Sequence, residues 1–278
     1  MPLASTDEIL AAARADGRGV GAFNVIQIEH AEAIVAGAGR AGRPVILQIS
    51  ENTVGYHGPL APIGLASLAL ARGARVPVAV HLDHARSPAL VAEAVELGFS
   101  SVMFDASHLP YEENLARTRA VTEDCHRAGV FVEAELGAIG GKDGAHAPGV
   151  RTDPDEARRF AAETAVDALA VAVGSSHAMR TRDAVLDFEL IGRLRAALGV
   201  ALVLHGSSGV PDSGLARAVA AGMTKVNIST HLNAVFTASL RRGLAAAPAT
   251  ADPRRYMGPA REATAAEVAR LLDVLAGR

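Results

Sequence analysis

The chain has 278 residues, a length that fits one or two ordinary domains or one (β/α)8 barrel of about 250 residues. Hydrophobic residues make up 50% of the chain and charged residues 21%, which excludes an intrinsically disordered protein. Lys and Arg number 27 against 30 Asp and Glu, so the net charge is −3. This balance provides no basic footprint for nucleic acid or for a membrane surface.

Cysteine content and the N-terminal segment indicate the compartment. Cys125 is the only cysteine, which excludes an internal disulfide and a CxxC zinc site and is typical of a reducing compartment. Residues 1–8 lack a basic segment followed by an apolar one, and no uninterrupted apolar run reaches about 18 residues. We therefore expect a cytoplasmic protein with no membrane partner.

Short apolar runs alternate with longer helical patterns along the chain. Ser5 and Glu8 fit a capping box that opens a first helix, which ends near residue 16. The predicted strands are residues 20–25, 44–49, 77–82, 101–104, 130–135, 168–173, 201–204 and 223–228. The predicted helices are residues 29–41, 61–71, 88–97, 111–127, 154–164, 188–198 and 215–220, followed by 230–246 and 259–275 after a loop at 247–256.

This order gives about eight β-then-α units with no linker between them. It predicts an α/β protein in which residues 1–278 form a single TIM (β/α)8 barrel domain, with an extra N-terminal helix and a C-terminal helical extension. A doubly wound open sheet is the alternative, but such a sheet seldom holds eight units in one layer. The longest irregular stretch, residues 137–152, is rich in Gly and is predicted to be functional or mobile.

Every predicted strand ends in polar residues, and in a barrel these ends share one rim where catalysis takes place. His84, His177 and His205 end strands three, six and seven. Three neutral imidazoles around an open position are typical of a catalytic Zn²⁺ site, so we expect these rings to converge on zinc. The alternative is that each is an ordinary hydrogen-bonded rim histidine. His81 has the opposite strand parity to His84 and is expected to support the site.

Carboxylates follow the same pattern. Asp83 adjoins His84 and is a candidate general acid or base. Asp105 and Glu135 are candidates to hold a second divalent or monovalent cation or to orient the histidines. Asp143 lies in the glycine-hinged loop and is a candidate to move over a substrate, a solvated turn being the alternative.

Two small-residue segments before helices predict an anion site. Loops after strands seven and eight commonly hold phosphate in such barrels, through backbone N–H groups and helix N-termini. The candidate phosphate-binding residues are Gly206, Ser207, Ser208, Asn227, Ile228, Ser229 and Thr230. A metal and a phosphate at one rim indicate a phosphorylated small-molecule substrate.

These residues resemble the class II, metal-dependent, fructose-bisphosphate and tagatose-bisphosphate aldolase family. The similarity runs through nearly the whole chain. It is carried by AFNV at 22–25, HLDH at 81–84, SVMFDASH at 101–108, EEN at 112–114, VEAELG at 132–137, LHG at 204–206, KVN at 225–227 and DPR at 252–254.

The resemblance implies roles for these residues. The three histidines would bind the catalytic zinc, Asp83 would be the general acid/base, and Asp105 and Glu135 would form the second cation position. The segments 206–208 and 227–230 would hold the phosphate of dihydroxyacetone phosphate, while Asn24 and Ser50 match family active-site positions. The resemblance also implies a homodimer or homotetramer and a reversible cleavage of a ketose phosphate, most often fructose or tagatose 1,6-bisphosphate.

Three departures from the family pattern concern the substrate. The family usually has His-Gly followed by Tyr and Lys after strand six, where this chain has Ala178 after the histidine; Arg180 and Arg182 are the candidates to replace that lysine. Asp143 stands where the family's loop acid is usually Glu. The small residues after strand seven are Gly206-Ser207-Ser208 rather than the usual Gly-Gly or Gly-Ala.

Other function classes remain to be separated. An aldolase for another ketose phosphate, or a sugar-phosphate isomerase or epimerase, would use the same metal site. A Schiff-base aldolase needs a lysine at a strand end, and the only lysines are Lys142 and Lys225, of which Lys225 lies before the end of its strand. A non-catalytic sugar-phosphate binding protein would have no use for Asp83 beside a metal ligand.

Overall fold

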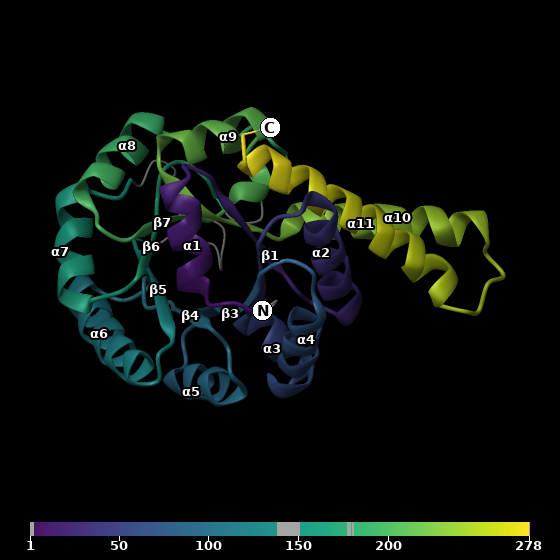
Figure 1. The fold of residues 1–278 in the computed structure, drawn as a ribbon, viewed down its shortest axis with the longest axis horizontal. Coiled ribbons are helices and arrows are strands. Elements are labelled where there is room, and N and C mark those ends of the chain that lie inside the picture. The colour runs from purple at the N-terminus through teal and green to yellow at the C-terminus, as the bar shows by residue number, and fades with distance from the viewer. Residues whose placement is uncertain (1–2, 138–150, 177–178, 180, 278) are drawn as a thin grey trace.

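The computed structural model describes residues 3–137, 151–176, 179 and 181–277. Within this part of the chain, eight parallel strands close into a barrel in sequence order (Figure 1). They are β1 (Val20–Asn24), β2 (Val45–Ser50), β3 (Val78–Ala85), β4 (Ser101–Phe104), β5 (Phe131–Leu136), β6 (Ala168–Val171), β7 (Ala201–Leu204) and β8 (Met223–Ile228). The predicted TIM barrel is confirmed, and each strand lies within three residues of its predicted bounds.

Helices surround the barrel as a ring. They are α2 (Ile28–Ala41), α4 (Ala61–Gly73), α5 (Pro88–Leu97), α6 (Tyr111–Arg127), α7 (Pro154–Thr164), α8 (Phe188–Ala197) and α9 (Asp212–Ala221). A short helix that the sequence did not predict, α3 (Glu51–His57), follows β2 directly. Its N-terminus is capped by Ser50, whose Oγ accepts a hydrogen bond from the Thr53 backbone N–H at 3.3 Å.

The N-terminal helix α1 (Thr6–Ala15) lies across the amino end of the barrel. Its buried residues Ile9, Leu10 and Ala13 pack in a core cluster with inward-facing strand side chains such as Phe131 and Val203. Ser5 occupies the N-cap position, but in the described part of the chain its side chain makes no capping hydrogen bond, so the predicted capping box is wrong in that detail. The helix therefore owes its position to burial of this apolar face, which seals the barrel floor.

A second, larger core lies between the barrel and the helices. It includes Phe23, Leu47, Leu82 and Val132 from the outer faces of four strands. Strand side chains alternate between the two cores because the period of a strand is two residues.

The C-terminal extension consists of α10 (Thr230–Ala246) and α11 (Arg254–Leu275), which together reach beyond the barrel wall (Figure 1). The helix α11 packs on α2, where Arg40 forms a two-point ion pair with Glu262 at 2.7 Å. The predicted start of this helix at residue 259 is five residues late, since Pro259 lies inside α11. Among the described residues, no helix is both long enough and apolar enough to span a membrane.

Candidate active site

Inward-facing polar side chains gather in the upper half of the barrel, above the apolar floor. At the carboxyl ends of the strands lies the rim cluster, defined here as Asp83, His84, Asp105, Glu135 and His205. Each of its members is at most 6% exposed. Below it lies the inner polar cluster, defined as His81, Ser101, Glu133 and Lys225, all of which are fully buried. Barrel interiors are normally filled by branched apolar residues, so this concentration of polar groups marks a functional region.

The end of β3 presents two consecutive side chains to the site. Strand alternation alone would place Asp83 and His84 on opposite faces. The pairing of β3 with β4 shifts register between Leu82 and Ala85, and His84 has a left-handed backbone with φ 51°. Because of this irregularity, both side chains belong to the rim cluster, with Asp83 Oδ1 3.9 Å from His84 Nε2.

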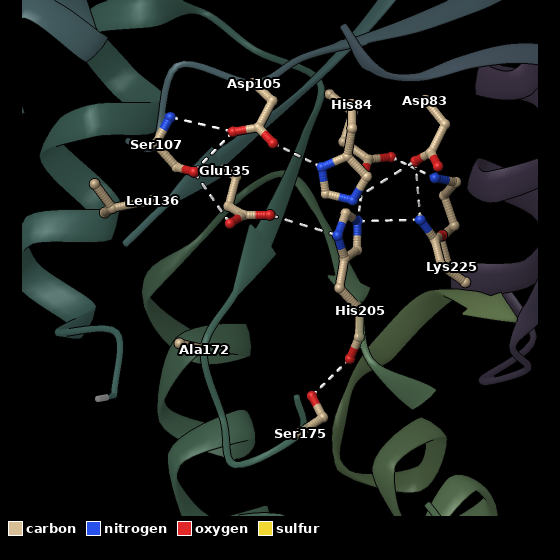
Figure 2. A network of polar contacts seen from close by, with 12 residues as sticks. Asp83, His84, Asp105, Ser107, Glu135, Leu136, Ala172, Ser175, His205 and Lys225 are labelled. Carbon is tan, nitrogen blue, oxygen red and sulfur yellow. Dashed lines mark hydrogen bonds and ion pairs between the residues drawn. The ribbon is translucent and has the colours of Figure 1, made fainter. Parts of the chain in front are cut away.

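His84 is oriented by a carboxylate from the next strand (Figure 2). Its Nδ1 lies 2.7 Å from Asp105 Oδ2. Ser107 donates its hydroxyl to the other Asp105 oxygen at 2.7 Å and to Glu135 Oε1 at 3.2 Å. Burial raises the pKa of Asp105, but the hydrogen bonds with His84 and Ser107 outweigh it and hold the pKa below its usual value. Asp105 is thus a carboxylate that fixes one nitrogen of His84 and directs the other toward Asp83.

His205 follows β7 and completes the cluster. Its ring lies against that of His84, with centroids 4.6 Å apart and planes at 72°. Its Nδ1 is 3.4 Å from Glu135 Oε2, and its backbone carbonyl accepts a hydrogen bond from Ser175 Oγ at 2.6 Å (Figure 2). Burial lowers the pKa of His205, which favours the neutral imidazole that a metal requires.

These groups have the chemistry of a metal site. Asp83, His84 and His205 each offer one ligand atom, and the three atoms lie within 4.8 Å of one another. His84, Asp105 and Glu135 form a second such group. Imidazole nitrogen and carboxylate oxygen together suit Zn²⁺, so the donor set fits the predicted ion. The third predicted ligand, His177, lies outside the described residues.

Asp83 is held by two amides. Asn24 Nδ2 donates to Asp83 Oδ2 at 3.1 Å, and Asn227 Nδ2 lies 3.4 Å from Asp83 Oδ1. Gln48 in turn donates to Asn24 Oδ1 at 2.7 Å. Ser50 lies beside Asp83 in the β2–β3 register. The structure therefore brings Asn24, Ser50 and Asn227, from three other strands, to the same end of the barrel as Asp83.

The segments predicted to bind phosphate lie at the start of α10. Gly206 has φ 65°, and a Cβ there would lie 2.6 Å from the Ser176 backbone. Ser208 Oγ accepts hydrogen bonds from the backbone N–H groups of Ser229 at 3.4 Å and His231 at 3.2 Å. The loops after β7 and β8 are thus joined at one helix N-terminus.

The other residues of these two segments differ in which groups they could offer to a ligand. Ser207 Oγ donates to the Asn227 carbonyl, and Thr230 begins α10. The side chain of Ile228 is buried in the outer core, so only its backbone is available to a ligand.

Some residues that sequence reasoning placed at the site are not part of the arrangement described above. Asp143, Ala178 and Arg180 lie outside the described residues. Arg182 donates to the Val210 carbonyl at 2.7 Å and pairs with Asp212 at 2.6 Å. The Arg182 guanidinium therefore holds the loop after β7 and is committed to protein partners.

Of the inner polar cluster, sequence reasoning named only His81, as a supporting residue, and it missed Ser101, Glu133 and Lys225; it also missed Gln48. Lys225 Nζ lies 2.7 Å from Glu133 Oε2, and His81 Nδ1 lies 2.8 Å from Ser101 Oγ. The signal was present in the strand period, because His81, Glu133 and Lys225 each lie two residues before a rim residue on the same inward face. The engagement of the Lys225 amine with a carboxylate counts against a Schiff-base role.

Comparison with known proteins agrees with this geometry. The family model described as fructose-bisphosphate aldolase class-II matches residues 4–277. The chain is 41% identical over 267 residues to a protein of Bacillus subtilis (strain 168) named "Probable fructose-bisphosphate aldolase", covering 95% of this chain and 94% of that protein. It is 39% identical over 267 residues to a fructose-bisphosphate aldolase of Staphylococcus aureus, covering 95% and 93%.

A solved structure extends the similarity to three dimensions. The crystal structure of the YdjI aldolase from Escherichia coli K12 aligns with a TM-score of 0.88 and 30% identity, over 98% of this chain and 97% of that one. Fold, rim cluster and sequence similarity lead to the same assignment. The chain belongs to the class II fructose-bisphosphate aldolase family, whose members are carbon–carbon lyases.

Proposed function

We propose that this protein is a metal-dependent aldolase that reversibly cleaves a ketose bisphosphate into dihydroxyacetone phosphate and an aldehyde. Fructose 1,6-bisphosphate is the first candidate substrate and tagatose 1,6-bisphosphate the second. The observation that carries the proposal is the convergence of Asp83, His84 and His205 within 4.8 Å at the rim of a barrel of this family. A site of this kind supplies both metal ligands and an acid/base group.

His84 and His205 would hold the catalytic Zn²⁺, with His177 as the third ligand. Asp105 and Glu135 would orient these rings or hold a second divalent or monovalent cation. A bound zinc ion supplies Lewis-acid stabilisation of the negative charge that develops on the ketose when its carbon–carbon bond breaks. His84 and His205 are buried and fixed by hydrogen bonds, so little reorganisation of these two rings is needed when charge develops.

Asp83 would move the proton that aldol cleavage requires. In the cleavage direction its carboxylate takes the proton from the C4 hydroxyl, and in condensation it returns this proton to the aldehyde oxygen. The amides of Asn24 and Asn227 fix the carboxylate plane from two sides. Asp143 would exchange the proton on the carbon of the ketone fragment from its loop.

The start of α10 is the proposed phosphate site. The backbone N–H groups at a helix N-terminus and the small residues of 206–208 and 227–230 offer hydrogen bonds and positive potential to an anion. Ala178 is the remaining candidate contact. Ser208 Oγ holds the two loops together by accepting from the N–H groups of Ser229 and His231, so a phosphate would bind the neighbouring N–H groups or take the place of this hydroxyl.

Cleavage and product analysis test the proposal. Zinc-loaded protein is assayed with ketose mono- and bisphosphates, and dihydroxyacetone phosphate is the expected product. Asp83→Asn should lose cleavage activity because it removes the acid/base carboxylate, and Asp124→Asn, at an exposed position on α6, is its matched control. Formation of an isomeric or epimeric sugar phosphate without cleavage would indicate an isomerase or epimerase instead. Binding without turnover would indicate a sugar-phosphate binding protein.

The proposal extends to the domain organisation, the oligomeric state and the cellular location of the enzyme. We expect a single domain over residues 1–278, a homodimer or homotetramer, and a cytoplasmic location. The lone cysteine, Cys125, supports a reducing compartment, since it is a free and buried thiol. Sedimentation velocity measures the oligomeric state directly.

A further inference from the structure

Lys225 and Glu133 form an ion pair inside the barrel, below the rim cluster. Both side chains are 0% exposed, and Lys225 Nζ lies 2.7 Å from Glu133 Oε2. Charges buried to this degree are costly and persist only where they have partners in good geometry. The ion pair takes no part in the proton transfers assigned to Asp83, so its position requires another explanation.

The second oxygen of the Glu133 carboxylate points at His205. Glu133 Oε1 lies 3.0 Å from His205 Nε2. An ionised carboxylate can only accept hydrogen bonds, so Nε2 must carry the ring hydrogen. The Lys225 ammonium lies 2.7 Å from the other oxygen, Oε2, and a positive charge at this distance favours the ionised carboxylate.

A neighbouring amide offers the opposite arrangement. Asn227 Nδ2 lies 3.1 Å from the same His205 Nε2. If Nε2 carried a lone pair instead of the hydrogen, it would accept a hydrogen bond from the Asn227 amide. That arrangement would place the lone pair against the Glu133 carboxylate. The Asn227 amide keeps the Asp83 carboxylate as an acceptor in either form, whereas Glu133 Oε1 receives a hydrogen from His205 only in the Nε2–H form.

We propose that Lys225 and Glu133 are positioning residues that fix the ring hydrogen of His205 on Nε2 and thereby present the Nδ1 lone pair to the rim cluster. His205 would then offer Nδ1 as its ligand atom, on the side of the ring that faces Glu135, whose Oε2 lies 3.4 Å away. The inference rests on the proposed role of His205 as a metal ligand and assigns a function to the buried ion pair beneath it.

The inner polar cluster anchors the ion pair to the barrel floor. Lys225 Nζ is 3.5 Å from His81 Nε2, and His81 Nδ1 is 2.8 Å from Ser101 Oγ. Ser101 in turn lies 2.6 Å from the hydroxyl of Thr6, in the first turn of α1. Hydrogen bonds therefore run from α1 to His205.

The test reads the tautomer and the metal affinity separately. Long-range ¹H–¹⁵N correlation spectra of the metal-free wild-type protein should show His205 protonated on Nε2, with the resonance assigned by its loss in His205→Asn. Glu133→Gln keeps the size of the side chain but adds a donor, so the hydrogen should shift toward Nδ1. The zinc dissociation constant, measured by competition with a chromophoric chelator, should rise about tenfold or more.

Thr164→Val is the matched control, because it removes a buried hydroxyl that bonds the Phe160 carbonyl within α7, away from the rim. It should leave zinc affinity unchanged. A wild-type His205 protonated on Nδ1 would overturn the proposal, and this measurement does not depend on any variant folding. A folded Glu133→Gln protein with wild-type zinc affinity would also overturn it. If instead the tautomer and affinity behave as expected but wild-type protein cleaves no ketose phosphate, the proposed function fails and the positioning role remains.

Discussion

Asp83 and His84 are neighbours in the chain, and both side chains enter the same cluster because His84 adopts φ 51° at a register shift of β3. A regular strand would direct one of them out of the barrel. The irregularity places a carboxylate within 3.9 Å of an imidazole that a second carboxylate orients. The backbone distortion therefore serves the site, as is common for residues held in sparsely populated conformations.

Replacement of Asp83 tests the acid/base role. Asp83→Ala removes the group that exchanges the C4 hydroxyl proton, so kcat for cleavage should fall about 100- to 10,000-fold. Zinc content, measured by atomic absorption, should stay near wild type, because the imidazole ligands are unchanged. An Asp83→Ala enzyme with full turnover would remove Asp83 from the mechanism.

Gly206 should resist substitution. Its φ of 65° disfavours any side chain, and a Cβ would lie 2.6 Å from the Ser176 backbone. Gly206→Ala should lower the free energy of unfolding by more than about 1 kcal/mol and raise the KM for the phosphorylated substrate. Gly199→Ala is the control, since a Cβ there has nothing within 4 Å. Equal stability of the two variants, measured by urea denaturation, would contradict the prediction.

Metal removal should separate activity from folding. Chelation should abolish cleavage while the far-ultraviolet circular dichroism spectrum remains that of a folded barrel, because the two apolar cores do not depend on the ion. Readdition of zinc should restore activity and, at about 100 times its dissociation constant, stabilise the protein by about 2.7 kcal/mol. Borohydride with substrate should leave Lys225 unmodified. Full activity in chelator, or covalent trapping on Lys225, would favour the Schiff-base alternative.

Glu267 on α11 should make stability depend on pH. Burial raises its pKa, but hydrogen bonds from Arg270 and His231 dominate and lower the pKa to about 2. The unfolded value is about 4.3, so this stabilisation is complete above that pH and is lost as the pH falls toward 2. Glu267→Gln should lower the stability at pH 7 and flatten its decline between pH 4.3 and 2. Denaturant titrations over this range, with exposed Glu123→Gln as control, provide the measurement; an unchanged decline would refute the assignment.

The sequence predicts the order and bounds of the elements well because the signals are local. Proline at the first helical position marks α5 and α7, and continuous apolar runs mark the buried strands. The helix α3 escapes prediction because it is seven residues long and has no apolar periodicity. It depends instead on a cap from Ser50, a residue that also ends β2.

The sequence predicts which residues form the candidate site, but not which of them contact one another. Rim position and motif identify Asp83, His84, Asp105, Glu135 and His205. The pairing of Asp105 with His84 requires the register between strands, which no single strand encodes. The ion pair of Glu133 with Lys225 joins strands that are not neighbours in the barrel, so it emerges only once the sheet closes.

The buried apolar face of α1, which closes the barrel floor, limits how the N-terminus can be altered. Ile9, Leu10 and Ala13 pack in the core at the end of the barrel opposite the rim, and Thr6 of the same helix is linked to Lys225 through Ser101 and His81. A version shortened beyond residue 15 would admit solvent from below and hydrate an ammonium group that the native interior keeps dry. Tags and fusions should therefore be attached ahead of Leu3 through a spacer, leaving its bridge to Val78 undisturbed.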